Sequence, residues 1–273
     1  MKELATRAIS GAIYVSLLLI SLKWSYVLIG VFFVFGIISL MEFNKLIHLK
    51  SIVPYIIFLI LYVCFGFWDE LIGYENGFSE AVQILQVITI FVLLFLIKDL
   101  FSEKRIPLFN TKRFIITTCY LTSGFVFLIL IAHFNRTFTP YLLLGCFILV
   151  WVNDSFAYLI GKNFGKQKLF PRVSPKKTVE GFLGGLFFAC IASYFIATFT
   201  ETLDFTKWLI LAIIVSVFGT LGDLIESKFK RQAEVKDSGV IMPGHGGLLD
   251  RLDSIIFAAP FVYVFLRFID YVS

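Results

Sequence analysis

Long apolar runs alternate with short polar segments along almost the whole chain. A helix needs about 20 apolar residues to cross a bilayer, with a range of about 17–25. Nine runs approach this length, at 5–22, 25–44, 52–68, 81–100, 114–133, 140–161, 179–200, 207–226 and 252–269. The pattern predicts an all-α, polytopic integral membrane protein with about nine transmembrane helices. The count falls to eight if the two runs around Lys23-Trp24-Ser25 do not both cross.

Composition supports this class. The 273 residues are 59% hydrophobic and 16% charged, whereas soluble domains average about 25% charged residues. Because neither a repeat nor a soluble domain stands out, we expect one membrane domain over 1–273. Residues 1–135 would supply lipid and dimer contacts, and 140–273 the catalytic helices and loops. Lys2 and Arg7 precede the first run as in a signal peptide, but no small-residue cleavage site follows, so this helix is expected to be retained.

The positive charges lie mostly on one side of the expected membrane. With a cytoplasmic N-terminus, 20 of the 24 Lys and Arg fall in inside segments, and only Lys23, Arg136, Lys207 and Arg267 fall outside. This asymmetry is a strong positive-inside signal, and it makes the long polar segments 162–177 and 227–251 cytoplasmic. No long basic run indicates nucleic-acid binding. The four cysteines form no CxxC pair and are expected to be small buried hydrophobes.

Carboxylates flank the second polar segment. Asp223 lies three residues before Glu226 on one helical face, near the membrane boundary, where an acid is expensive unless it meets protein, water or a cation. The alternative is a helix-end acid paired with Lys228 or Arg231. Asp250 and Asp253 share a face of the next helix, where the helix dipole also favours acids. Because Mg²⁺ prefers one or two carboxylates plus substrate phosphates, Asp223 and Asp250 are candidate metal ligands.

The turn Pro243-Gly244-His245-Gly246-Gly247 cannot form a regular helix. Its glycines permit positive φ and close backbone approach, so the turn is either an anion nest for phosphate or a plain tight loop. His245 would orient a phosphate or only fix the turn. The chain lacks the GxxxxGK[ST] pattern of P-loop enzymes.

A second polar group lies at 151–185. Asp154 falls inside an expected helix, where a buried acid needs a partner. Membrane topology and attraction to anionic lipids explain the positive charge of the loop that follows. They do not explain a buried acid at Asp154. Thr178 is expected to cap the seventh helix, with Gly181 three residues on. Gly181, Gly184 and Gly185 are expected to serve close helix packing.

Residues 227–253 resemble the signature of the phosphatidate cytidylyltransferase, or CDP-diacylglycerol synthase, family. The positions that match in register are Ser227, Lys230, Arg231, Lys236, Asp237, Gly239, Pro243, His245, Gly246, Gly247, Asp250, Arg251 and Asp253. Met242 departs from the usual Leu, Ile or Phe but is similar in size. The segments 153–158 and 174–181 look like further family features, whereas the first half matches only in spanning a membrane.

The resemblance implies that phosphatidate attacks the α-phosphorus of CTP, giving CDP-diacylglycerol and pyrophosphate. It implies Mg²⁺ at Asp223 and Asp250, with K⁺ beside it, and a homodimer. We expect Lys176, Lys177, Arg231, Lys236 and Arg251 to hold phosphates, and Asp237 and Asp253 to orient basic groups. His245 is counted with these catalytic candidates, and Asp154, Gly246 and Gly247 are assigned to cofactor binding.

Two other functions fit parts of the pattern. A CTP-dependent kinase of a long-chain lipid alcohol would release CDP instead of pyrophosphate. A transporter of an anionic metabolite would place Asp154 and Asp223 in its pathway. Transporters usually bind substrate near the bilayer midplane, whereas these polar clusters gather at one face, so the transferase is favoured.

Overall fold

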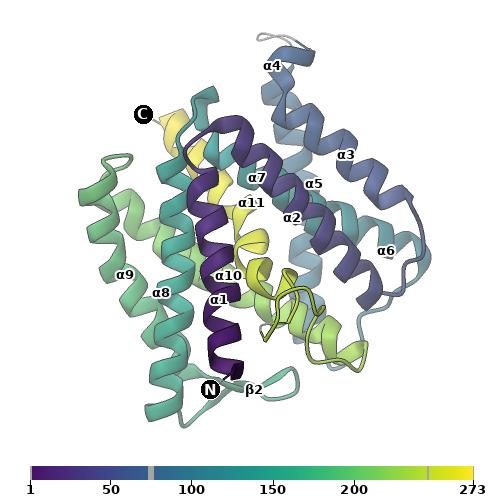
Figure 1. Ribbon diagram of the computed structural model, residues 1–273, viewed down its shortest axis with the longest axis vertical. Coiled ribbons are helices and arrows are strands. Elements are labelled where there is room, and N and C mark those ends of the chain that lie inside the picture. Colours follow the sequence, from purple (N-terminus) through teal and green to yellow (C-terminus); the bar gives the residue numbers. More distant parts are fainter. Residues whose placement is uncertain (1, 73–76, 245, 273) are drawn as a thin grey trace. The chain divides into compact units, whose positions relative to one another are not determined.

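The computed structural model describes residues 2–72, 77–244 and 246–272, and its described part is almost entirely helical (Figure 1). Within it, seven helices are long and apolar enough to cross a membrane, and the apolar helices Ile9–Ser21 and Val53–Gly66 are shorter. All nine expected runs therefore lie on helices. The all-α, polytopic fold predicted from the sequence is confirmed. The four cysteines are free. Cys119 and Cys146 are buried as expected, whereas Cys64 and Cys190 are only partly buried, so the expectation is wrong for these two.

The chain divides into two compact units. The first comprises residues 1–130 and 229–252, and the second comprises 131–228 and 253–273. Segment 229–252 thus belongs with the N-terminal helices, although it lies late in the sequence. The expected single domain, with a division into 1–135 and 140–273, stays a prediction.

The first unit contains the N-terminal helices. They are α1 (Lys2–Ser21), α2 (Ser25–Leu46), α3 (Val53–Gly66), α4 (Trp68–Leu71), α5 (Phe78–Phe101), α6 (Asn110–Ile116), the π-helical turn η1 (Thr117–Thr122) and most of α7 (Ser123–Ala132). Aromatic side chains form much of the core: Phe43 of α2 meets Tyr120 and Phe229 edge to face, with ring centroids 5.6 and 5.2 Å away. Such pairs stabilise beyond the area they bury, and they fix the end of α10, which carries Phe229, to α2.

The second unit contains the 3₁₀ turn η2 (Phe134–Arg136), α8 (Pro140–Phe164), β1 (Lys168–Phe170), β2 (Ser174–Thr178) and α9 (Val179–Thr200), together with most of α10 (Phe205–Gln232) and α11 (Leu249–Val272). Strands β1 and β2 form a short antiparallel hairpin in which Lys168 pairs with Thr178. The hydroxyl of Thr178 accepts a hydrogen bond of 3.1 Å from the Gly181 N–H. Thr178 therefore caps α9, and the predicted N-cap is confirmed.

Helices α8 and α9 lie side by side (Figure 1) because glycines remove side chains between them. A Cβ on Gly181 would meet the Ala157 carbonyl, and one on Gly184 would overlap Ile160. A Cβ on Gly185 would overlap the Asn153 backbone. The expected packing role of these three glycines is confirmed, and it sets β2 and its lysines beside the start of α9.

Candidate active site

Three carboxylates gather in the second unit. Asp223 and Glu226 lie one turn apart on α10, and Asp253 lies in the second turn of α11. One oxygen of each lies within 4.8 Å of the other two, and among the described residues this group of three acids could hold a metal ion. Glu226 is fully buried and Asp253 is 6% exposed. Three hard oxygen ligands at this spacing fit a divalent cation such as Mg²⁺.

Lys177 at the end of β2 meets this acidic group. Its ammonium forms an ion pair with Asp223, which also accepts a 3.2 Å hydrogen bond from the Ser227 hydroxyl. Burial alone lowers the pKa of Lys177, but nearby Asp223, Asp154 and Asp253 outweigh it, so the pKa lies above its usual value. Lys177 is therefore a cation throughout the neutral pH range, held by β2 against a metal-ligand candidate.

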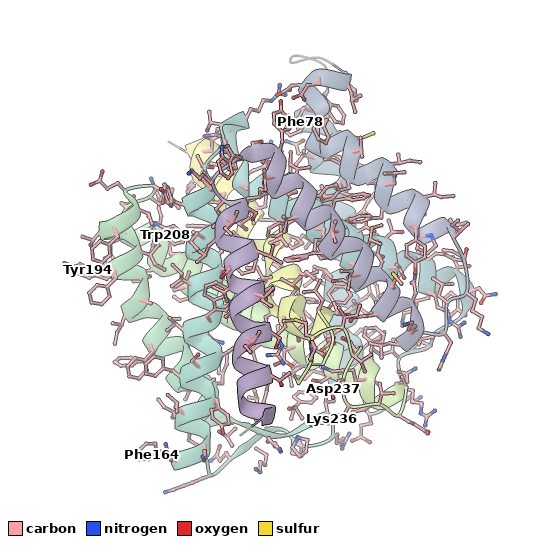
Figure 2. All side chains as sticks on the ribbon, viewed as in Figure 1. Phe78, Phe164, Tyr194, Trp208, Lys236 and Asp237 are labelled. Atoms are coloured by element: carbon pink, nitrogen blue, oxygen red, sulfur yellow. The ribbon has the colours of Figure 1, made fainter. Side chains whose placement is uncertain are left out.

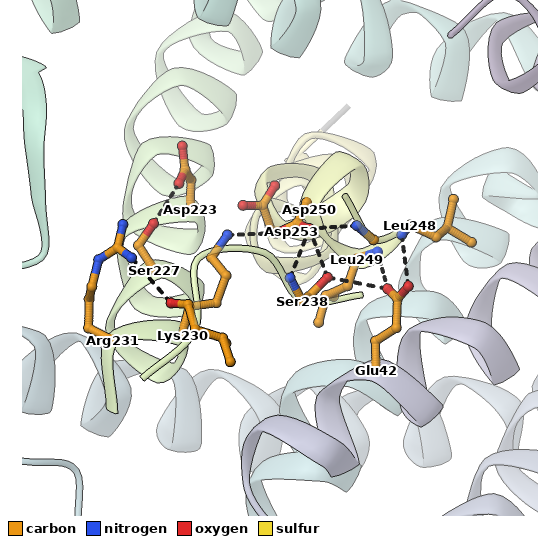
Figure 3. Close-up of polar contacts among 12 residues, drawn as sticks. Glu42, Asp223, Ser227, Lys230, Arg231, Ser238, Leu248, Leu249, Asp250 and Asp253 are labelled. Atoms are coloured by element: carbon orange, nitrogen blue, oxygen red, sulfur yellow. Dashed lines mark hydrogen bonds and ion pairs between the residues drawn. The ribbon is translucent and has the colours of Figure 1, made fainter. Parts of the chain in front are cut away.

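Asp250 has a different environment, in the first unit. One of its oxygens lies 2.6 Å from the Lys230 ammonium, and the other accepts hydrogen bonds from the Ser238 hydroxyl and from the N–H groups of Ser238 and Gly247 (Figure 3). Both side chains of the ion pair are at most 10% exposed. Because Asp223 and Asp250 belong to different units, their expected sharing of one metal ion stays a prediction.

The turn after α10 is irregular, as the sequence predicts. Gly244 and Gly246 have φ of 78° and 92°, and Met242 and Gly246 exchange backbone hydrogen bonds across a tight turn. The Gly247 N–H donates to Asp250 at 2.7 Å. The amides of Gly246 and Gly247 are thus engaged within the protein, so phosphate binding at them, which stays a prediction, requires these bonds to exchange. His245 lies outside the described residues.

Glu42 on α2 completes this network, and the sequence-based candidates omitted it. Its carboxylate accepts hydrogen bonds from the N–H groups of Leu248 and Leu249, at 3.1 and 2.8 Å, and lies 3.3 Å from the Ser238 hydroxyl (Figure 3). Glu42 is 2% exposed. A signal was available, because an acid inside an apolar helix marks a functional position by default.

The expected phosphate-binding cations are mostly accessible. Lys176, Arg231, Lys236 and Arg251 are exposed, and Figure 2 shows Lys236 and Asp237 on the loop after α10. Arg231 donates to the Val235 carbonyl at 3.2 Å. Asp154 is exposed on α8 and accepts a 3.3 Å hydrogen bond from Asn153. The expectation that Asp154 is buried is wrong, because its face of α8 is turned away from the interior of the protein.

Comparison with known proteins identifies the family. Residues 4–269 match the model of the cytidylyltransferase family. A phosphatidate cytidylyltransferase from Bacillus subtilis (strain 168) is 35% identical over 270 residues, covering 97% of each chain. One from Staphylococcus aureus (strain COL) is 39% identical over 189 residues, which are 68% of this chain and 71% of that one. The chain therefore belongs to the cytidylyltransferase family.

Proposed function

We propose that this protein is a phosphatidate cytidylyltransferase. An anionic oxygen of phosphatidate attacks the α-phosphorus of CTP, the bond between the α-phosphorus and its bridging oxygen breaks, and pyrophosphate leaves with that oxygen. The product is CDP-diacylglycerol. The full-length similarity to the Bacillus protein of that name and the signature at 227–253 support the reaction. No general base is required, because a phosphate monoester is already anionic near neutral pH.

The acidic group on α10 and α11 is the observation that carries the chemistry. Asp223, Glu226 and Asp253 bring three oxygens within 4.8 Å of one another in the described structure, as a divalent ion requires. We assign Mg²⁺ to this group, with Asp223 as the ligand predicted from the sequence. When bound, Mg²⁺ supplies charge neutralisation of phosphate oxygens. In this proposal Asp250 is the other predicted metal ligand, and K⁺ binds beside Mg²⁺.

The basic candidates have two roles in this proposal. Lys177 is held against Asp223, so it is ready to neutralise a phosphate oxygen close to the metal ligands. The exposed side chains of Lys176, Arg231, Lys236 and Arg251 bind the remaining phosphates of CTP or the lipid headgroup. Transfers of this kind depend mainly on positioning and charge stabilisation, which such cations supply. Asp237 orients these basic groups. The bound nucleotide is contacted by Asp154, Gly246 and Gly247, and His245 supports a phosphate.

The site faces the cytoplasm in this proposal. The 20-to-4 distribution of Lys and Arg supports this side, where CTP is available. The lipid phosphate enters from the cytoplasmic leaflet, and the enzyme acts as a homodimer in the membrane.

Product analysis tests the reaction. Purified protein is given CTP, Mg²⁺ and either phosphatidate or a long-chain lipid alcohol. We expect pyrophosphate to form only with phosphatidate. Release of CDP with the alcohol would identify a lipid kinase, and flux of an anionic metabolite into proteoliposomes without turnover would identify a transporter. Either result would overturn the proposal.

A further inference from the structure

Glu42 is a buried acid in a membrane helix, and its described partners all come from segment 238–249. The N–H groups of Leu248 and Leu249 stand at the start of α11, where helical amides have no partner within their own helix. One oxygen of Glu42 accepts from Leu248, and the other accepts from Leu249. Glu42 therefore caps α11 from a helix about 200 residues away in the sequence. The positive end of the helix dipole further stabilises its charge.

The same segment is shaped around this carboxylate. A Cβ added to Gly239 would overlap the Glu42 carboxylate, and one added to Gly247 would meet both Glu42 and the Ser238 hydroxyl. Neither residue has a positive φ, so backbone conformation does not require glycine at these two positions. The close approach of the Glu42 side chain is what requires glycine there. These two glycines of the signature are thus explained by a residue on α2.

Glu42 and Asp250 interlock through shared donors. The Ser238 hydroxyl lies 3.3 Å from Glu42 and 3.0 Å from Asp250, so its one hydrogen is offered to two carboxylates (Figure 3). Asp250 also accepts from the Gly247 N–H, and Glu42 accepts from the next two amides along the chain. Movement of Glu42 would therefore displace the amides and hydroxyl that orient Asp250.

We propose that Glu42 is a positioning residue of the transferase, holding segment 238–249 so that Asp250 and the adjoining basic residues keep the orientation that turnover needs. This role rests on the proposed function, in which Asp250 acts at the reacting phosphates. Glu42 itself, capped by backbone donors in the protein interior, does not contact substrate.

The first test compares Glu42→Gln with Ser39→Ala. Gln keeps the size of Glu, but it turns one acceptor into an N–H₂ group facing a backbone N–H. Ser39 is a matched control, because it lies one turn earlier on α2 and its buried hydroxyl has no hydrogen-bond partner in the described structure. We expect Glu42→Gln to lower kcat by roughly ten- to hundredfold, the effect of losing charge-assisted hydrogen bonds, with a much smaller change in KM. Ser39→Ala should match wild type.

Hydrogen exchange supplies a measurement that is independent of turnover. In lipid nanodiscs without substrates, the Leu248 and Leu249 amides should exchange faster in Glu42→Gln than in wild type or Ser39→Ala. If wild-type protein makes no CDP-diacylglycerol, the proposed function fails, and exchange alone decides whether Glu42 holds this segment. Unchanged exchange at both amides, or a kcat within about twofold of wild type, overturns the inference.

A second variant covers poor folding of Glu42→Gln. Ser238→Ala removes only the hydroxyl between the two carboxylates. We expect kcat to fall by roughly three- to tenfold, as for loss of one hydrogen bond, and exchange at the Gly247 and Leu248 amides to rise. Wild-type kcat and exchange in this variant would overturn the inference even if Glu42→Gln cannot be purified.

Discussion

At the scale of single residues, the main result is the separation of two carboxylate environments. Asp223 lies with Glu226 and Asp253 and pairs with Lys177. Asp250 is bound by Lys230 and by backbone donors. Buried ion pairs leave a costly uncompensated charge when one partner is removed. Substitutions in the two environments therefore have different expected consequences.

Asp223→Asn should lower turnover by at least about 100-fold, because a metal ion contributes several kcal/mol of charge stabilisation in the transition state. The protein should still fold in the membrane. Steady-state kinetics on purified protein measures the loss. Asp204→Asn is the matched control, since Asp204 is an exposed acid paired with Lys207, and such pairs contribute little. Near-wild-type turnover of Asp223→Asn would remove Asp223 from the metal site.

The raised pKa of Lys177 predicts a pH dependence of stability. Burial opposes the charged form, but Asp223 and its neighbours outweigh it, so the folded pKa exceeds the reference value of 10.5. The stabilisation from this charge is therefore fully present below pH 10.5 and is lost as pH rises through the folded pKa. The difference in thermal stability between wild type and Lys177→Gln should be constant from about pH 7 to 9. A difference that shrinks within that range would contradict the ion pair.

At the scale of elements, hydropathy located the helices but not all their ends. All nine apolar runs are helical, because a backbone in lipid must satisfy its own hydrogen bonds. The run expected to end at 226 continues in α10 to Gln232. Hydropathy assigns polar residues to loops, yet Lys228 and Lys230 are buried on this last part of the helix. Lys230 is paired with Asp250, 20 residues later in the sequence, and hydropathy does not detect a partner at that distance.

The sequence also predicted part of the candidate site, but not all of it. The signature identified Asp250 and Asp253. The cost of an acid near the membrane boundary pointed to Asp223, and the spacing placed Glu226 on the face of Asp223. Glu42 was missed although an acid inside an apolar helix is itself a signal. Its partners, Leu248 and Leu249, lie about 200 positions later and use backbone groups, so no side-chain pattern links them to Glu42. The hairpin of β1 and β2 was also missed, since its three- and five-residue strands are too short for an alternating pattern.

The cap on α9 gives a prediction for one element. Thr178→Val keeps the β-branched shape but loses the hydroxyl that accepts from Gly181. Loss of such a cap costs about 1 kcal/mol, with a range of about 0.5–2. Denaturant unfolding in detergent should detect this difference. Thr198→Val is the control, because its hydroxyl bonds the Tyr194 carbonyl within the helix and is exposed. Equal stabilities of the two variants would contradict the capping role.

The packing of α8 on α9 gives a second prediction at the scale of elements. Gly185→Ala would place a methyl group against the Asn153 carbonyl, and overpacking of this kind costs about 1–3 kcal/mol. Gly30→Ala is the control, since a Cβ there meets nothing within 4 Å. The midpoint of thermal unfolding should fall only for Gly185→Ala. An unchanged midpoint would show that the two helices do not need this close approach.

At the scale of the whole molecule, the distribution of charge predicts which segments face each side of the membrane. In a chain with its four cysteines replaced by Ala, Arg172→Cys should react with a membrane-impermeant maleimide in inverted vesicles and not in intact cells. Glu201→Cys should show the reverse. Both positions are exposed in the described structure. The opposite labelling pattern would invert the topology and remove the site from the cytoplasm.

The proposed reaction depends on which part of CTP reaches the lipid. Purified protein in nanodiscs is incubated with phosphatidate, Mg²⁺ and CTP labelled at either the α- or the γ-phosphate. We expect the α-label to enter the lipid as CDP-diacylglycerol and the γ-label to be released as pyrophosphate. Recovery of the γ-label in the lipid, or of neither label, would contradict it.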